Sequence, residues 1–332
     1  MDAVVNWLLM FLPRAIRQGV PLLFGSTGEI LTEKSGHLNL GIPGIMYMGG
    51  VSGIIGAFFY ERFAGDAYIG WLAVLITTLS ALLGAAVMAL IYSFLTVTLR
   101  ANQNVTGLAL TTFGMGVGNF FGGSLAQLFG EGGSLSVKRT SEVFCKTLPF
   151  ADDLGAVGTL LFDYGFLVYL SVAIALVVAW FLKKTRAGLN LRSVGEDPAT
   201  ADAAGINVTR HKYLSTVIGG AIAGLGGLYY IMDYTHGTWS DGGFGDRGWL
   251  AIALVIFALW KPASAIWGSF LFGGLYVLPA YLNFGDNRSM QYLVSMLPYV
   301  VTLVVLIITS MRKKREHQPP ASLGLPYFRE ER

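Results

Sequence analysis

The side chains that could do chemistry are few in this 332-residue chain, and they are scattered. The four histidines, His37, His211, His236 and His317, are far apart, and two of them lie in or beside basic runs. General acid–base catalysis and metal binding both need such groups to converge at short range. The single cysteine, Cys145, excludes an intramolecular disulfide and any cysteine-only metal site. The sequence therefore predicts no catalytic constellation and no metal site.

Three carboxylates, those of Glu29, Glu33 and Asp163, lie near the ends of apolar segments. Ion-driven carriers typically hold acidic or basic side chains inside the membrane as relays. Because these three lie at segment ends, we interpret them as residing in interfacial water. The chain contains no G-x-x-x-x-G-K-[ST] sequence, so it does not bind ATP through a P-loop. Its basic clusters flank apolar segments, where topology explains them, so nucleic-acid binding is not predicted.

Neutral polar residues inside the apolar segments are the better functional candidates. The segment TEKSGHLNLGIPGIMYMGG carries Asn39, Gly41, Pro43 and Gly44, a pattern typical of a helix that breaks within a membrane beside a cavity. Further along the chain come Asn104, Thr106, Thr111 and Asn119. As a group, these eight residues predict a pathway for a polar, neutral solute. For each polar side chain the alternative is a hydrogen bond between helices.

The elements that carry these residues are membrane helices. Residues of the types AVILMFWYC make up 54% of the chain and charged residues only 13%, whereas soluble proteins carry about 25% charge. The apolar residues form long runs, which is the signature of transmembrane segments. No basic region precedes the first apolar run, so no cleavable signal peptide is predicted. The expected fold class is an all-α polytopic membrane protein.

The apolar runs and basic intervals together predict a topology. The runs are 15–31, a segment ending at Tyr60, 68–99, 105–125, 158–182, 213–232, 248–260, 263–282 and 291–310. The positive-inside rule places the basic interval 183–212 and the basic run 312–315 in the cytoplasm. Counting the apolar runs backwards from the basic interval 183–212 places the N-terminus outside the cell, whereas Arg14 and Arg17 favour a cytoplasmic N-terminus. A re-entrant course of one of the first two segments, or an extra helix hidden in residues 1–13, would reconcile the two.

This topology gives a simple domain organisation. Residues 1–311 form a transmembrane domain with a cytoplasmic loop at 183–212, and residues 312–332 form a basic, disordered cytoplasmic tail. The glycines of the run 213–232, among them Gly220 and Gly224, have the spacing of a close helix–helix contact, which is the reading we prefer for them.

The basic interval contains one short helix signal. Asp197 suits the N-cap, Pro198 the first helical position and Gly205 the position just past the end. A helix of this length extends about 10 Å and is not stable alone in water. The segment is therefore either part of a surface loop without a further role or a helix that needs a partner to pack against.

Two stretches resemble a known family. TEKSGHLNLGIPGIMYMGG and TRAGLNLRSVGEDPATADAAGINVTRHKYLSTVIGGAIAGLGG look like the permease subunits of bacterial ATP-binding cassette (ABC) importers for branched-chain amino acids, ribose-type sugars and nucleosides. The later stretch GDRGWLAIALVIFALWKPASAIWGSFLFGG looks closest to the nucleoside branch. The resemblance covers roughly Gly25 to Ile308. It implies the ABC importer transmembrane-domain fold, with about 8–10 transmembrane helices, some of them discontinuous.

The resemblance also implies partners. It implies a non-enzymatic subunit of the bacterial cytoplasmic membrane that pairs with a second, related permease. A separate ABC ATPase would bind ATP and Mg, and an extracytoplasmic substrate-binding lipoprotein would deliver the solute. The short helix resembles the coupling helix that contacts the ATPase. The positions that match its motif are Glu196, Asp197, Pro198, Ala201, Ala204 and Gly205.

One departure and several alternatives remain at this point. Pro43 stands where the family often has a glutamate, so no role for that carboxylate is carried over. The solute could be a simple sugar or a branched-chain amino acid. An ion-coupled secondary carrier, with an ion site at the break Asn39–Gly44, is a less favoured class. A membrane-embedded enzyme is a third class, for which the sequence offers no catalytic cluster.

Overall fold

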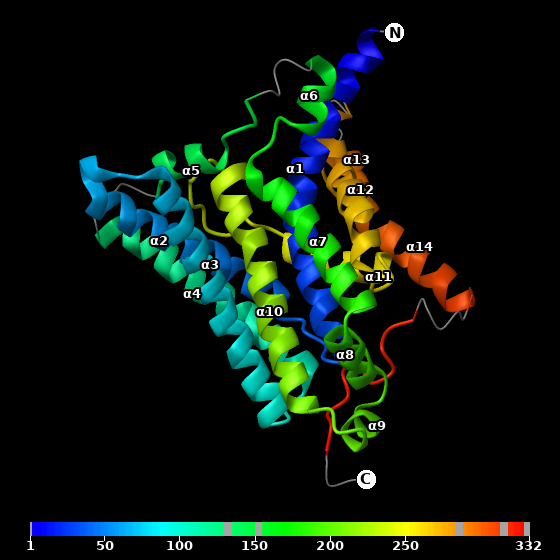
Figure 1. Cartoon of the computed structure of the whole chain (residues 1–332). Coiled ribbons are helices and arrows are strands. Elements are labelled where there is room, and N and C mark those ends of the chain that lie inside the picture. The colour runs from blue at the N-terminus through cyan, green and yellow to red at the C-terminus, as the bar shows by residue number, and fades with distance from the viewer. Residues whose placement is uncertain (1, 129–134, 150–154, 283–287, 313–317, 329–332) are drawn as a thin grey trace.

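The structure is a computed structural model, and it describes residues 2–128, 135–149, 155–282, 288–312 and 318–328 (Figure 1). Most residues in these ranges are helical, and the β-structure there is one isolated bridge between Ser136 and Thr238. Among the described residues, five helices are long and apolar enough to cross a membrane, and a sixth span is present if the bent pair α13–α14 counts as one. The predicted all-α polytopic membrane fold is confirmed.

Helix α1 (Asp2–Glu33) runs without interruption through Pro13 and Pro21. At 1.5 Å per residue its 32 residues extend about 48 Å. There is therefore no separate helix hidden in residues 1–13. Its first residues and the short helix α9 (Pro198–Ala203) lie at opposite ends of the molecule (Figure 1). This agrees with the topology counted back from the basic interval. We call the end that carries α9 the α9 end.

Three helices form the centre of the molecule, and their backbones touch. They are α1, α2 (Ile42–Ala64) and α10 (Val208–Tyr229), which continues as a π-helical turn over Tyr230–Tyr234. A Cβ on Gly28 would overlap the carbonyl oxygen of Gly219, and one on Gly227 would overlap that of Met46. Gly49 approaches Gly224 in the same way. These contacts, which we call the glycine seam, confirm close packing as the role of the glycines in 213–232.

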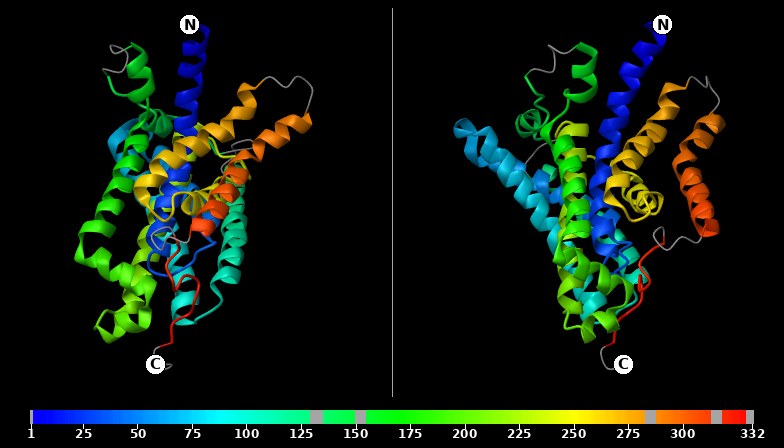
Figure 2. Two further views of the ribbon diagram at one scale, coloured as in Figure 1. Left: turned by 90° about the vertical axis from the view of Figure 1, so that its right-hand side faces the viewer. Right: turned by 45° about the vertical axis from the view of Figure 1, so that its right-hand side comes forward.

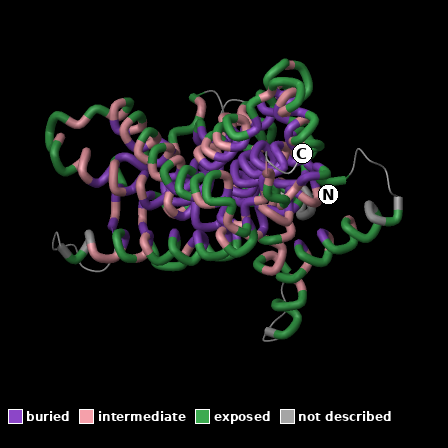
Figure 3. Tube along the Cα trace, turned by 90° about the horizontal axis from the view of Figure 1, so that it is seen from below, coloured by how far each residue is buried: buried purple, intermediate pink, exposed green. Residues whose placement is uncertain are grey.

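Four further helices of 19 residues or more pack around this centre. They are α3 (Gly70–Ser93, with a π-helical turn at Phe94–Thr98), α4 (Gln103–Leu128), α7 (Phe166–Lys184) and α12 (Pro262–Tyr281). Large apolar side chains such as Leu83, Trp180 and Trp267 are exposed on their outer surfaces. Seen along the axis, buried residues fill the middle and exposed ones the rim (Figure 3). Such an outer surface fits a surrounding of lipid rather than water.

The structure revises two of the predicted spans. The run 158–182 is broken, because α6 (Gly155–Leu161) ends before Asp163 and α7 begins at Phe166. The run 248–260 contains only α11 (Arg247–Phe257), whose 11 residues extend about 16 Å, half of a hydrocarbon core of about 30 Å. A loop over residues 235–246 precedes α11, so this crossing is discontinuous.

Shorter helices complete the described chain. Helix α5 (Lys138–Phe144) lies at the end opposite α9, and α8 (Arg186–Glu196) leads into α9 (Figure 1). Helices α13 (Arg288–Ser295) and α14 (Leu297–Arg312) meet at a bend of 42°. α14 stands at the edge of the bundle, and the tail residues 318–328 run down to the α9 end (Figure 2).

The prediction of a disordered tail is wrong for residues 318–328. Ser322 is buried, its amide donates to the carbonyl oxygen of Gly195 (3.0 Å), and its hydroxyl donates to the same oxygen (2.6 Å). The amide of Gly324 donates to the carbonyl of Gly36 (3.3 Å). Composition favours disorder, but partners on two distant segments satisfy the polar groups of this stretch. The remainder of the basic run, 313–315, and residues 329–332 lie outside the described residues.

Candidate functional site

The α9 end is built around a single aspartate that ends one helix and begins the next. The amide of Asp197 donates to the carbonyl of Ser193 at the end of α8 (2.9 Å). Its carboxylate accepts from the amides of Ala199 (3.0 Å) and Thr200 (3.2 Å), and also from the Thr200 hydroxyl. The hydrogen bonds from Thr200 and Ala199 hold the pKa of Asp197 below its usual value. This carboxylate is therefore ionised and fixed at the helix N-terminus, where the helix dipole favours negative charge.

The other end of α9 closes as the sequence predicts. The helix ends at Ala203, and Gly205 has φ +82°, a conformation that glycine adopts without strain. The amide of Ala204 donates to the carbonyl of Thr200 (3.0 Å), and that of Ile206 to the carbonyl of Ala201 (3.0 Å). These bonds satisfy the last carbonyl groups of a six-residue helix.

The six residues of the predicted coupling set divide between two faces of this helix. Glu196, Asp197, Ala204 and Gly205 are exposed, and Pro198 is half-buried. Ala201 instead is buried, packed with Val194 of α8 and Val208 of α10. Ala201 therefore holds α9 to the rest of the chain, and the exposed face consists of short side chains that would let another backbone approach closely.

The tail supports this helix from the side. Tyr327 packs against the buried cluster around Ala201, and its hydroxyl donates to the carboxylate of Asp202 on α9 (2.8 Å). The Ser322 bonds to Gly195 fix the preceding α8. Three segments far apart in the sequence, the α8–α9 pair, the connection between α1 and α2, and the tail, therefore meet at this end.

Five of the eight predicted pathway residues lie where α2 meets its neighbours. Gly41 and Gly44 pack against Leu110 and Thr111 of α4, and the Thr111 hydroxyl donates to the carbonyl of Leu40 (2.8 Å). Pro43 meets Gly248 at the start of α11. Asn39 is buried, and its side-chain oxygen accepts from the amide of Gly41 (2.9 Å).

The other three pathway residues lie elsewhere on α4 or at its start. Asn104 is exposed and Thr106 is half-buried. Asn119, further along, accepts from the Tyr47 hydroxyl, which in turn accepts from the amide of Gly242 (3.1 Å). Pro43 faces α11 and Asn104 is exposed, so the eight residues lie on or beside α2 and α4 without gathering at one point. Their role as a pathway stays a prediction.

Glu29 and Glu33 do not lie in interfacial water, and that interpretation is wrong. Both are buried in the last turns of α1, with exposed fractions of 0% and 3%. Glu29 accepts from the backbone amide of Asn39 (3.0 Å), and Glu33 accepts from the indole N–H of Trp260. The physical reason is that the 34–41 connection folds back over the end of α1 and covers it. Asp163, by contrast, is partly exposed and pairs with Arg17 (3.6 Å).

His37 is a second buried group at this end. Its Nδ1 lies 2.7 Å from the hydroxyl of Thr216, and its Nε2 lies 2.7 Å from that of Thr96. Thr96 donates its own proton to the carbonyl of Tyr92 (2.6 Å), so Nε2 must donate and Nδ1 must accept. Burial, helped by the charge of Lys212, lowers the pKa of His37 to about 3. The imidazole is therefore a neutral link between α3 and α10.

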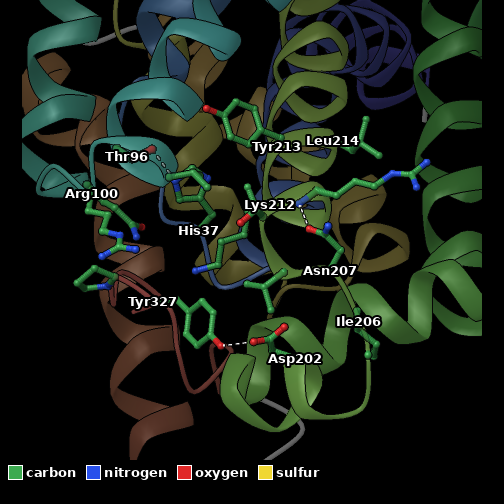
Figure 4. Close-up of a pocket in the computed structure, with 17 residues that line it drawn as sticks. His37, Thr96, Arg100, Asp202, Ile206, Asn207, Lys212, Tyr213, Leu214 and Tyr327 are labelled. Atoms are coloured by element: carbon green, nitrogen blue, oxygen red, sulfur yellow. Dashed lines mark hydrogen bonds between the residues drawn. The ribbon is translucent and has the colours of Figure 1, made fainter. Parts of the chain in front are cut away.

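A cavity of about 710 Å³ opens beside His37 (Figure 4). Its walls are the start of α10, the chain around Arg100 between α3 and α4, and the tail near Tyr327. None of the eight pathway residues is among the described residues that line it.

The sequence did not predict that three groups at the α9 end are buried. They are the two carboxylates of α1, the imidazole of His37 and the ammonium of Lys212. One signal was available, because Glu29 and Glu33 are four residues apart and so share one helical face that runs into the glycine-rich break. No sequence signal pointed to Trp260 or the tail as partners, since both contacts are long-range.

Comparisons with known proteins agree over almost the entire chain. Residues 12–308 match the family model described as "Branched-chain amino acid transport system / permease component". The chain is 29% identical to the guanosine ABC transporter permease protein NupQ of Bacillus subtilis (strain 168), over 99% of each chain. It is 31% identical to the nucleoside ABC transporter permease protein NupC of Lactococcus lactis subsp. cremoris (strain MG1363), over 92% of this chain and 93% of that one. It is 30% identical to TsgC13 of Haloferax volcanii, which carries the provisional name of a glucose ABC transporter permease protein. The match covers 95% of this chain and 96% of that one.

Proposed function

Because the chain belongs to the family of branched-chain amino acid transport system permease components, we propose that it forms half of a nucleoside pathway through the cytoplasmic membrane. It is a multi-pass transport subunit of an ABC importer and not an enzyme. The observation that carries the choice of solute is the end-to-end similarity to a guanosine permease, together with that to a second nucleoside permease. A simple sugar is the second candidate, favoured by the similarity to TsgC13.

The exposed face of α9 is the contact for a separate ATPase that binds ATP and Mg. The absence of a P-loop in this chain is in keeping with this division of labour. The exposed, short side chains and the doubly capped backbone make α9 a small rigid projection, which suits insertion into a groove. Closure of the ATPase would displace α9 and, through the short turn at 204–207, the long helix α10.

A second, related permease would complete the pathway against α4. Asn104, Leu108, Thr112 and Gly116 are all exposed and are spaced four residues apart, so they form one stripe on α4. A stripe that includes an amide, a hydroxyl and a glycine suits a protein neighbour or an aqueous pathway better than lipid. An extracytoplasmic binding lipoprotein would deliver the solute at the end opposite α9.

Transport itself tests the solute. The chain would be expressed with its ATPase, second permease and binding lipoprotein, and uptake of radiolabelled guanosine, adenosine, glucose and leucine would be compared. We expect guanosine or adenosine uptake that excess unlabelled nucleoside abolishes and excess glucose does not. Uptake of glucose alone would replace the nucleoside assignment with the sugar one. Uptake that survives an inactivating P-loop substitution in the ATPase would instead point to an ion-coupled carrier.

Two substitutions test the α9 contact. Asp197→Arg removes the cap and reverses its charge, and Gly205→Pro cannot adopt φ +82°. We expect both variants to insert normally and to lose uptake and ATPase copurification. Asp66→Arg is the matched control, because Asp66 is an exposed aspartate at the opposite end. Normal copurification and uptake in both α9 variants would refute the coupling role.

A further inference from the structure

The cavity at the α9 end has a charged group for which the described part of the chain supplies no direct partner. Lys212 lines this cavity and is only 4% exposed. Among the described residues, its ammonium group has no hydrogen bond and no ion pair. Burying an unpaired ammonium is expensive, and proteins normally pair such a group or leave it in water. Figure 4 shows Lys212 between His37 and Tyr327, beside the open space.

The other described groups that line the cavity are mostly neutral or cationic. His37 is neutral, and both of its ring nitrogens are engaged by threonine hydroxyls. Asp202 is the one carboxylate among the lining residues that the structure describes, and it accepts from Tyr327 at the wall (2.8 Å). Arg100 and Arg210 add positive charge, and the guanidinium of Arg100 lies 4.7 Å from the ring centre of Phe328. Within the described chain, the lining therefore has three cationic side chains against one carboxylate.

The volume of the cavity and the neutral polar side chains in its wall also suit a small ligand. The volume of about 710 Å³ lies within the usual range of small-molecule sites, roughly 300–1,000 Å³. Gln103, Asn207 and Thr209 contribute side chains that can donate hydrogen bonds to an anion.

We propose that this cavity binds a phosphate-bearing anion, with the Lys212 ammonium as its buried counter-charge and Arg100 as a second cationic contact. Phosphate oxygens accept several charge-assisted hydrogen bonds at once, which matches converging lysine and arginine groups. The ligand is either a phospholipid headgroup or a soluble phosphate compound, and both present the same chemistry. A bound anion would contact α10, the tail and the α3–α4 connection together.

Binding to the full-length purified permease tests the proposal without any transport. In one arm, phosphatidylglycerol or phosphatidylcholine is added to the protein in detergent, and native mass spectrometry counts the lipids retained. In the other arm, inorganic pyrophosphate is titrated calorimetrically. Lys212→Met keeps the apolar stem and removes the charge. Lys34→Met is the matched control, because Lys34 is half-buried at the same end but is not among the residues that line the cavity.

We expect the wild type and Lys34→Met to bind at least one probe with similar affinity, and Lys212→Met to bind it about tenfold or more weakly. Arg100→Gln changes an exposed residue and should weaken binding as well, so the test survives if Lys212→Met fails to fold. Selective retention of phosphatidylglycerol assigns a lipid source, and pyrophosphate binding assigns a soluble one. Absence of binding in both arms, or equal binding by wild type and by both cavity variants, overturns the proposal.

Discussion

Asp197 combines a structural role and a charge, and substitutions can separate them. Asparagine caps helices as well as aspartate does, whereas alanine removes the acceptor of the Ala199 and Thr200 amides. We expect Asp197→Asn to keep α9 and ATPase copurification, and Asp197→Ala to lose both in part. Hydrogen exchange of the 199–204 amides should accelerate about fivefold in Asp197→Ala only. Equal exchange in the two variants would show that the cap does not stabilise α9.

His37 predicts a pH dependence of stability. It lies in the connection between α1 and α2, and its pKa is about 3, against 6.5 for an unperturbed histidine. The unfolded chain takes up a proton below pH 6.5 and the folded chain does not, so stability is present above that pH and falls as the pH decreases. From pH 7 to pH 5 the loss is about 2 kcal/mol.

Thermal unfolding in detergent measures this effect. We expect the decrease in Tm between pH 7 and pH 5 to become smaller in His37→Asn, whatever the absolute Tm of that variant. His211→Asn, which changes a less buried histidine at the same end, should keep the wild-type slope. The same slope in His37→Asn and wild type would contradict a buried, neutral imidazole.

At the scale of elements, the tail is a support for α8 and α9. Removing residues 318–332 deletes the Ser322 and Tyr327 bonds and uncovers the cluster around Ala201. We expect limited proteolysis to cut within 195–207 several-fold faster in this truncated chain. Removing only residues 329–332 is the control and should change nothing. Unchanged proteolysis after the longer truncation would mean that α8 and α9 hold together without the tail.

Elements that depend on local chemistry could be predicted from the sequence, and those that depend on distant partners could not. Asp197, Pro198 and Gly205 mark the ends of α9 through local capping chemistry, and the observed ends follow the prediction. The burial of Glu33 depends on Trp260, more than 200 residues away, and the order of the tail depends on Gly195 and Gly36. The break at 39–44 could be located, but whether it opens to a cavity depends on how α4 and α11 pack on it.

At the scale of the molecule, the two ends should face opposite sides of the membrane. In a Cys145→Ser background, Asp66→Cys and Ala203→Cys place one exposed thiol at each end. We expect a membrane-impermeant maleimide to label the first from outside the cell, and the second only after permeabilisation. Labelling of both from the same side would refute the topology.

The long helix α1 has a consequence for biogenesis. It is synthesised before the helices that pack on it, yet it carries Arg17, Gln18, Glu29 and Glu33, and three of these four side chains end up buried in the protein. A charged side chain at the centre of an isolated membrane helix costs about 2.5–3.5 kcal/mol on insertion scales. The groups that shield them, such as Trp260 and Arg247, leave the ribosome more than 200 residues later. We therefore expect α1 to stay beside the nascent chain until α11 and the residues just after it, which include Trp260, have been synthesised.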